Sequence, residues 1–210
     1  MPRVLIVTND FPPRTGGIQF FVHALALRLP PESVRVYAPA WPGAAEFDAA
    51  QPFPVIRHPG SLMLPVPSVG ARACALLAEY GCDSVLFGAA APLGLLAPRL
   101  RSAGARRIIG LTHGHEAGWA ALPGARSLLR RIGDDADTLT YLAEYFRIRL
   151  ARALSADAAG RMVRLAPGVD PAEFRPAAGG PRIRGEFGIA RTGPWSCACR
   201  GWCRVRARTP

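Results

Sequence analysis

Short apolar runs alternate with amphipathic segments along most of this chain, and this alternation limits the possible fold more than any other feature. The first unit is an apolar run at residues 4–7, a turn that contains Gly16 and Gly17, and apolar residues at helical spacing from 18 to 29. Further short strand-like runs follow at residues 33–38, 55–58, 84–87, 108–112, 138–141 and 163–166. Repeated strand and helix units form a parallel sheet with helices on both faces, so the sequence predicts an α/β, Rossmann-like fold.

The turn after the first apolar run is the first candidate site. Gly16 and Gly17 allow the backbone to come close to a ligand, and the free N–H groups at the start of the following helix attract an anion such as a phosphate. Ligands of open parallel sheets bind at the carboxyl ends of the strands, where this turn lies. A tight turn without a ligand is the alternative, because glycine is common in turns.

A second polar group follows the run at residues 108–112. His113, His115 and Glu116 come directly after it, at the predicted carboxyl edge of the sheet, where groups that move protons would lie in the ligand crevice. A zinc pair or a structural histidine are alternatives. The chain has no later histidine and no matching set of acidic residues, so we expect no metal.

The chain is strongly basic, with a formal net charge of +11 over 210 residues and a pI near 10.8. A basic chain favours an anionic partner such as nucleic acid, acidic lipid or a phosphorylated substrate. All 26 basic residues are arginine, a bias typical of GC-rich coding, so part of this charge reflects composition. The arginine-rich segment at 126–132 predicts a helix that contacts acidic lipid or forms a solvated face. A nucleic-acid-binding module is disfavoured, because the basic residues are scattered without aromatic interleaving and no nucleic-acid motif occurs. A module that binds anionic membranes without catalysis is the other alternative.

The remaining segments give coarser expectations. Residues 39–54 predict a long loop, residues 61–67 an irregular proline-stiffened loop, and residues 71–80 and 144–153 two helices. The Asp-x-Asp pattern at 134–137 precedes a strand, so we interpret it as helix-to-strand surface. The N-terminal apolar run is too short for a signal peptide or a membrane span, which predicts a cytoplasmic protein.

Four motifs occur in an order known from one enzyme family. They are residues 7–14 with 16–19, residues 87–93, residues 112–116 with Gly118 and Trp119, and residues 167–170 with Phe174. Together they resemble the N-terminal half of the retaining family-4 glycosyltransferases, over roughly residues 3–188. Within that family, the motifs are most similar to those of actinobacterial mannosyltransferases that act on phosphatidylinositol mannosides.

The resemblance implies the GT-B architecture, in which two Rossmann-like halves face each other across a cleft. The first half binds mainly the acceptor and the second half mainly the sugar nucleotide. The donor would be GDP-mannose and the acceptor an anionic inositol glycolipid, with no metal or other cofactor. The implied location is the inner face of the plasma membrane, in peripheral contact with acidic lipid.

The resemblance also implies roles for individual residues. Gly16 and Gly17 would approach the donor diphosphate, and His113 would contact the transferred sugar and help to organise the transition state. The acceptor side would be lined by Asn9, Asp10 and Gln19. Further candidates for the site are Arg14, His115 and Glu116.

The end of the chain departs from the family. We expect a domain at residues 1–176, a linker at 177–192 and an aberrant tail at 193–210, where the family's second half should begin with a strand. With plausible codons, an overlapping reading frame of the tail gives an apolar strand and an Arg/Lys loop. We therefore hypothesise a frameshift, which would leave the second domain missing and the chain inactive alone, and which sequencing of the locus tests. The alternative, zinc binding by Cys197, Cys199 and Cys203, lacks a fourth ligand.

Overall fold

The computed structural model describes residues 2–172 together with Gly185, Glu186 and Gly188. The chain divides into two units, residues 1–167 and residues 168–210, and the sheet belongs to the first. The predicted domain limit at residue 176, the tail at 193–210, the motif residue Phe174 and all but three residues of the linker lie outside the described residues.

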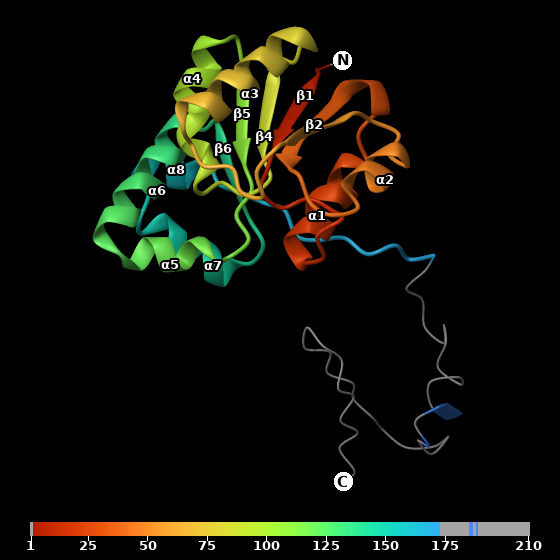
Figure 1. Ribbon diagram of the computed structural model, residues 1–210. Helices are drawn as coiled ribbons and strands as arrows, with labels where there is room; N and C mark the ends of the chain where they lie inside the picture. Colours follow the sequence, from red (N-terminus) through yellow and green to blue (C-terminus); the bar gives the residue numbers. More distant parts are fainter. Residues whose placement is uncertain (1, 173–184, 187, 189–210) are drawn as a thin grey trace. The chain divides into compact units, whose positions relative to one another are not determined.

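The first unit is a seven-stranded parallel sheet in the order β3-β2-β1-β4-β5-β6-β7, with helices packed against it (Figure 1). The strands are β1 (Val4–Val7), β2 (Val34–Pro39), β3 (Val55–His58), β4 (Ser84–Phe87), β5 (Arg107–Gly110), β6 (Thr138–Tyr141) and β7 (Val163–Arg164). The helices are α1 (Gly17–Ala26), α2 (Ala44–Ala49), α3 (Pro67–Glu79), α4 (Ala97–Ser102), α5 (Glu116–Ala121), α6 (Pro123–Asp135), α7 (Glu144–Ala151) and α8 (Ala156–Gly160), with 3-10 turns η1 (Pro31–Ser33) and η2 (Leu93–Leu96).

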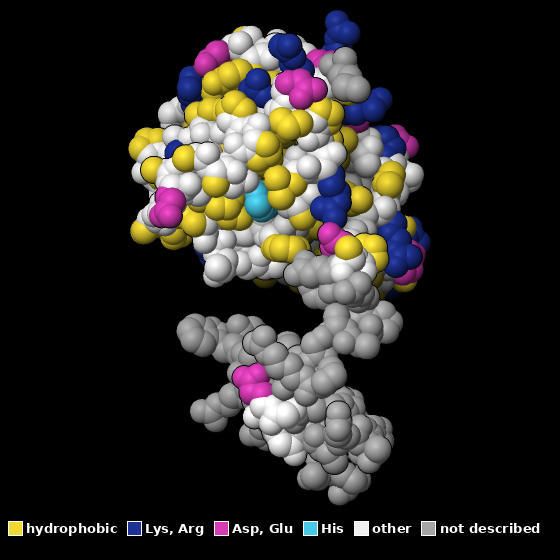
Figure 2. Space-filling model, turned by 90° about the vertical axis from the view of Figure 1, so that its right-hand side faces the viewer, with side chains coloured by type: hydrophobic (Ala, Val, Ile, Leu, Met, Phe, Trp, Pro, Cys, Tyr) yellow, Lys and Arg dark blue, Asp and Glu magenta, His cyan; other side chains and the backbone are white. Residues whose placement is uncertain are grey.

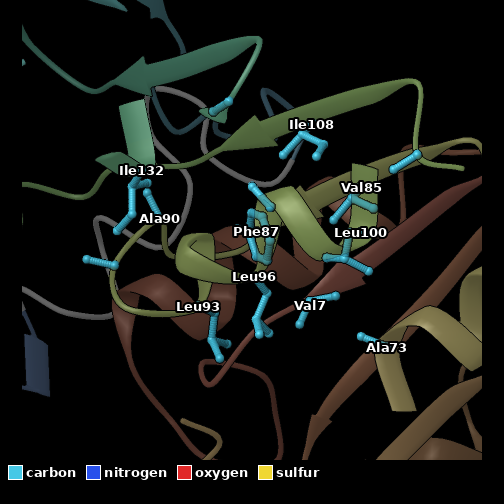
Figure 3. Close-up of a cluster of buried hydrophobic side chains, with 14 of the residues drawn as sticks. Val7, Ala73, Val85, Phe87, Ala90, Leu93, Leu96, Leu100, Ile108 and Ile132 are labelled. Atoms are coloured by element: carbon cyan, nitrogen blue, oxygen red, sulfur yellow. The ribbon is translucent and has the colours of Figure 1, made fainter. Parts of the chain in front are cut away.

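Helices pack against both faces of the sheet. Successive strand residues point to opposite faces, so Leu5 and Val7 pack in one core cluster with side chains of α3, α4 and α6, whereas Ile6 packs in a second cluster with α1. Figure 3 shows part of the first cluster, where strand residues meet the apolar side of η2 and α4 through Val7, Val85, Phe87, Leu93, Leu96 and Leu100. The predicted α/β fold with helices on both faces is confirmed.

Two predictions of local structure were wrong, and one helix was not predicted. The helix α2 lies inside residues 39–54, which were predicted as a loop. The helix predicted from residue 71 begins at Pro67 instead, because proline is accepted in the first helical turn, where its missing N–H is not needed. The short helix α5, directly after the polar group at 113–116, was not predicted.

An open hollow lies along the sheet face that carries α1. It has a volume of about 680 Å³, and its apolar lining includes Leu86, Ile109 and Leu111 of the sheet side, together with Leu25 of α1 and Leu29, which follows α1. None of the candidate site residues lines it. The hollow is therefore separate from the crevice expected at the carboxyl edge of the sheet.

Candidate functional site

The candidate residues follow the carboxyl ends of β1 and β5. In the sheet, β1 lies between β2 and β4, so the connections after β1 and β4 lead to opposite faces, with α1 on one and η2 with α4 on the other. Such a reversal of strand order is where open α/β sheets bind ligands. The structure thus brings two motifs that are about a hundred residues apart in the chain to one edge of the sheet, on either side of β4.

The turn between β1 and α1 is held by hydrogen bonds of its own side chains. The Asp10 N–H donates to Thr8 Oγ1 at 2.9 Å, and Gln19 Nε2 donates to Asp10 Oδ1 at 2.8 Å. A Cβ added at Gly16 would lie 2.1 Å from Gln19 Oε1, whereas a Cβ added at Gly17 would meet nothing within 4 Å. Glycine at position 16 is thus explained by the folded-back Gln19 side chain, and Gly17 leaves open space beside the start of α1.

The N-terminus of α1 is suited to an anion. Among the described residues, no side chain caps this helix and its first turn holds no acidic residue, so its free N–H groups and its dipole favour a negative charge. Arg14 adds positive charge in the same turn, and its guanidinium carbon lies 5.1 Å from the centre of the Trp41 ring. Such stacking holds a guanidinium group while leaving its N–H donors available.

Two residues tie this turn to the rest of the domain. The side-chain amide of Asn9 donates to Met63 O at 2.9 Å and accepts from Met63 N–H at 2.7 Å, which fixes the loop at residues 61–67. Arg57 donates to Pro12 O at 2.6 Å and forms an ion pair with Asp48 at 2.7 Å. The sequence reasoning missed Arg57, and the signal for it was a charged residue inside the short strand β3.

His113 is fixed by the end of β4. Its Nε2 lies 2.6 Å from Gly88 O, and because a carbonyl only accepts, Nε2 carries the proton in this contact. The ring packs edge-on against Phe21 of α1, with 5.6 Å between the ring centroids. Burial lowers the pKa of His113 below its ordinary value of 6.5, although the Gly88 carbonyl and the Glu116 carboxylate oppose this shift. The ring is therefore neutral near pH 7, with Nδ1 as a hydrogen-bond acceptor.

The lowered pKa of His113 gives a first prediction. Because the folded chain binds a proton here less readily than the unfolded chain, the contribution of His113 to stability is complete above pH 6.5 and is lost as the pH falls from 6.5 through the lowered pKa. We expect the imidazole NMR signal of His113 to titrate below pH 6.5. His113→Gln should remove this signal and reduce the loss of thermal stability on acidification. Titration of His113 at or above its ordinary pKa would contradict the prediction.

His115 and Glu116 complete this edge of the sheet. Glu116 is fully buried, and its Oε2 accepts from the backbone N–H groups of His113 at 3.0 Å and Gly114 at 3.1 Å. His115 Nε2 lies 3.5 Å from Glu116 Oε1, and the His115 ring is parallel to the His113 ring. The three residues predicted from this motif therefore form one connected group.

The described residues contain no group of three or more His, Cys, Asp or Glu side chains arranged to hold a metal ion. The expectation that the site needs no metal stays a prediction.

A helix that spans a membrane must be both long and apolar. None of the helices in the described part of the chain is both long enough and apolar enough to cross a membrane.

Comparison with known proteins identifies the family. Residues 15–173 match the family model described as Glycosyltransferase Family 4. The chain belongs to this family. Family membership agrees with the resemblance of the four motifs, three of which lie wholly or largely within the matched residues.

The similar curated proteins are mannosyltransferases. The chain is 51% identical over 182 residues to the GDP-mannose-dependent alpha-(1-6)-phosphatidylinositol monomannoside mannosyltransferase of Mycobacterium tuberculosis, a match that covers 84% of this chain and 47% of that protein. The protein of the same name in Mycolicibacterium smegmatis is 51% identical over 177 residues, or 82% of this chain and 46% of the relative. A Corynebacterium glutamicum protein named as acting on the monoacylated form is 42% identical over 83% of this chain and 46% of its own length. The chain thus spans about half the length of these relatives.

The fold also has counterparts among solved structures. The crystal structure of Anabaena HepE in complex with UDP-glucose matches 90% of this chain and 50% of that chain, with a TM-score of 0.64 and 14% sequence identity. At this identity the likeness concerns the fold alone. It confirms that the described domain has the architecture of one half of a GT-B glycosyltransferase.

Proposed function

We propose that this domain is the acceptor-side half of an enzyme that transfers mannose, with retention, from GDP-mannose to a phosphatidylinositol mannoside. The observation that carries the proposal is the 51% identity over 84% of the chain to a protein named for this donor and acceptor. The arrangement of the site supports it, because a diphosphate leaving group and a sugar need an anion-binding turn beside hydrogen-bonding side chains. The activity belongs to a protein about twice the length of this chain.

In this proposal, Gly16, Gly17 and the first N–H groups of α1 approach the donor diphosphate. Oriented N–H groups stabilise the negative charge that grows on a diphosphate as the glycosidic bond breaks, and they do so without a metal. His113 contacts the transferred sugar from the opposite side of β4. Asn9, Asp10 and Gln19 line the acceptor side, and Asn9 acts through the loop at residues 61–67 that it holds.

Surface features support peripheral contact with an acidic membrane at the cytoplasmic face. Leu62 and Leu64 are 58% and 49% exposed, an arrangement that suits contact with lipid. The helix α6 exposes Arg130 and Arg131, which suit acidic head groups, although each also lies within ion-pair distance of an aspartate one turn later, Asp134 at 3.9 Å and Asp135 at 3.7 Å. On the face shown in Figure 2, basic side chains are scattered among hydrophobic ones and form no continuous basic surface of the kind that nucleic acid requires.

Binding of the acceptor head group tests the proposal. The probe is the deacylated, water-soluble form of a phosphatidylinositol monomannoside, titrated into the 210-residue chain by calorimetry. We expect binding. Arg14 follows the acceptor-side residues Asn9 and Asp10 in the turn, and we assign its guanidinium, held over Trp41, to the phosphate of the acceptor. Arg14→Ala should then weaken binding by about tenfold, because a charge-assisted hydrogen bond to phosphate contributes roughly 1.5 kcal/mol.

An arginine at the other end of α1 provides the control. Arg28 follows α1 and donates to Ala24 O, away from the turn, so Arg28→Ala should leave the affinity unchanged. Equal losses of affinity in both variants would show that only net charge matters.

We also expect no mannosyl transfer by this chain when GDP-mannose and the lipid are supplied together. Robust turnover would contradict the assignment of the donor site to the other half.

A further inference from the structure

Glu116, the first residue of α5, is unusual because its carboxylate has no access to water. The side chain is 0% exposed, and a buried carboxylate oxygen is stable only when it accepts hydrogen bonds. Oε2 meets this requirement with the N–H groups of His113 and Gly114. Oε1 has no hydrogen bond from the described residues, and the polar atom that faces it is Nε2 of His115 at 3.5 Å.

The tautomer of His115 follows from this contact. A carboxylate oxygen cannot donate, and an unprotonated Nε2 would face Oε1 with one lone pair against another, so the contact favours the form of His115 with its proton on Nε2. In the neutral ring, Nδ1 is then the unprotonated nitrogen. His113 has the same tautomer for a separate reason, because its Nε2–H donates to Gly88 O at 2.6 Å. Both rings therefore hold their protons on the side that contacts the protein.

The two rings are also held in a common orientation. Their planes differ by 7° and their centroids lie 6.5 Å apart. The segment that carries them is anchored at both ends, by the Thr112 hydroxyl bonded to Thr140 O at its start and by the Glu116 carboxylate at its end. The side chain of His115 is 43% exposed, so this ring is open to a ligand.

We propose that Glu116 is a positioning residue for sugar transfer: one oxygen holds the backbone of His113, and the other fixes His115 as the Nε2–H tautomer. The two parallel imidazoles then each offer Nδ1 as a hydrogen-bond acceptor. Hydroxyl groups are the matching donors, so the pair suits the hydroxyls of a hexose at the transfer point. This inference rests on the proposed function for the identity of the ligand, but not for the state of the rings.

The test is the tautomeric state of each ring in the 210-residue chain, measured by long-range 1H–15N correlation of ¹⁵N-labelled imidazoles at a pH well above the reference pKa of free histidine, about 6.5. In the unaltered chain we expect both rings as Nε2–H. In Glu116→Gln, the amide oxygen continues to accept from the two backbone N–H groups, so its NH₂ faces His115. A donor in that place requires an acceptor, and His115 should change to the Nδ1–H tautomer while His113 stays Nε2–H.

The control is Glu144→Gln, the same change in the first turn of α7, where the exposed carboxylate pairs with Arg147. It should leave both tautomers unchanged. The proposal is overturned if His115 is Nδ1–H in the unaltered chain, a measurement that does not depend on how any variant folds, or if it stays Nε2–H in a folded Glu116→Gln. The tautomer measurement uses no sugar nucleotide and no lipid. Failure of acceptor binding would therefore overturn the proposed function but would not change the measured tautomers.

Discussion

Gly88→Ala is expected to lower the free energy of unfolding by about 3 kcal/mol, because the new methyl group has no space. The added Cβ would lie 2.4 Å from Thr8 Oγ1 and 2.5 Å from Thr8 Cβ. Thr8 is fully buried and its hydroxyl is bonded to Asp10 N–H, so it cannot move aside alone. Separating β1 from β4 would break the Gly88 N–H bond to Val7 O at 3.0 Å. Urea denaturation followed by circular dichroism measures the loss.

A glycine in open space gives the matched control. Gly124 is the second residue of α6, and a Cβ added there would meet nothing within 4 Å. Alanine in a helix is favoured over glycine, so Gly124→Ala should leave stability unchanged or raise it by about 0.5 kcal/mol. If both variants lost the same amount of stability, the close approach of β1 and β4 at Gly88 would be disproved. The comparison matters for the site, since Gly88 O is the acceptor for His113.

The strands were the most predictable part of the fold. Central parallel strands need apolar residues, and the apolar runs at 4–7 and 84–87 coincide with β1 and β4. The runs at 55–58 and 138–141, which mix apolar and polar residues, coincide with β3 and β6. Helix limits were less predictable. The prolines near residue 67 were interpreted as excluding a helix, but proline also starts helices, and Pro67 is the first residue of α3. The short helices α2 and α5 each have only six residues, too few to show a helical period.

The residues of the site were predictable, but their contacts were not. Polar residues after apolar runs must lie near the carboxyl edge of a parallel sheet, which is why Asp10 and His113 belong to one region. The contacts that fix them join distant parts of the chain, as in the bond from Arg57 to Pro12 O across 45 residues. No local pattern carries such information. Glu116 is the exception, because its bonds to His113 and Gly114 span only three and two residues.

Gly114→Ala is expected to lower the free energy of unfolding by about 3 kcal/mol through two separate effects. Gly114 has φ +97°, a conformation that side chains rarely adopt, which by itself costs about 1–2 kcal/mol. In addition, the new Cβ would lie 2.7 Å from Cε1 of the Phe146 ring on α7. Denaturation measures the total, and NMR of the His113 and His115 rings reports whether the segment between them has moved.

Two further variants separate these effects. Gly104 has φ +108° and its nearest neighbour to an added Cβ is Leu77 at 4.0 Å, so Gly104→Ala should show the backbone penalty alone. Phe146→Ala removes the ring that an added Cβ at position 114 would meet, so Gly114→Ala in that background should also fall to about 1–2 kcal/mol. The two substitutions at 114 and 146 are then coupled, because each changes the effect of the other. The outcome against this account is that the two substitutions are additive and that Gly114→Ala costs no more free energy of unfolding than Gly104→Ala. Phe146 would then not confine the segment. The parallel arrangement of His113 and His115 would depend on Glu116 and Thr112 alone.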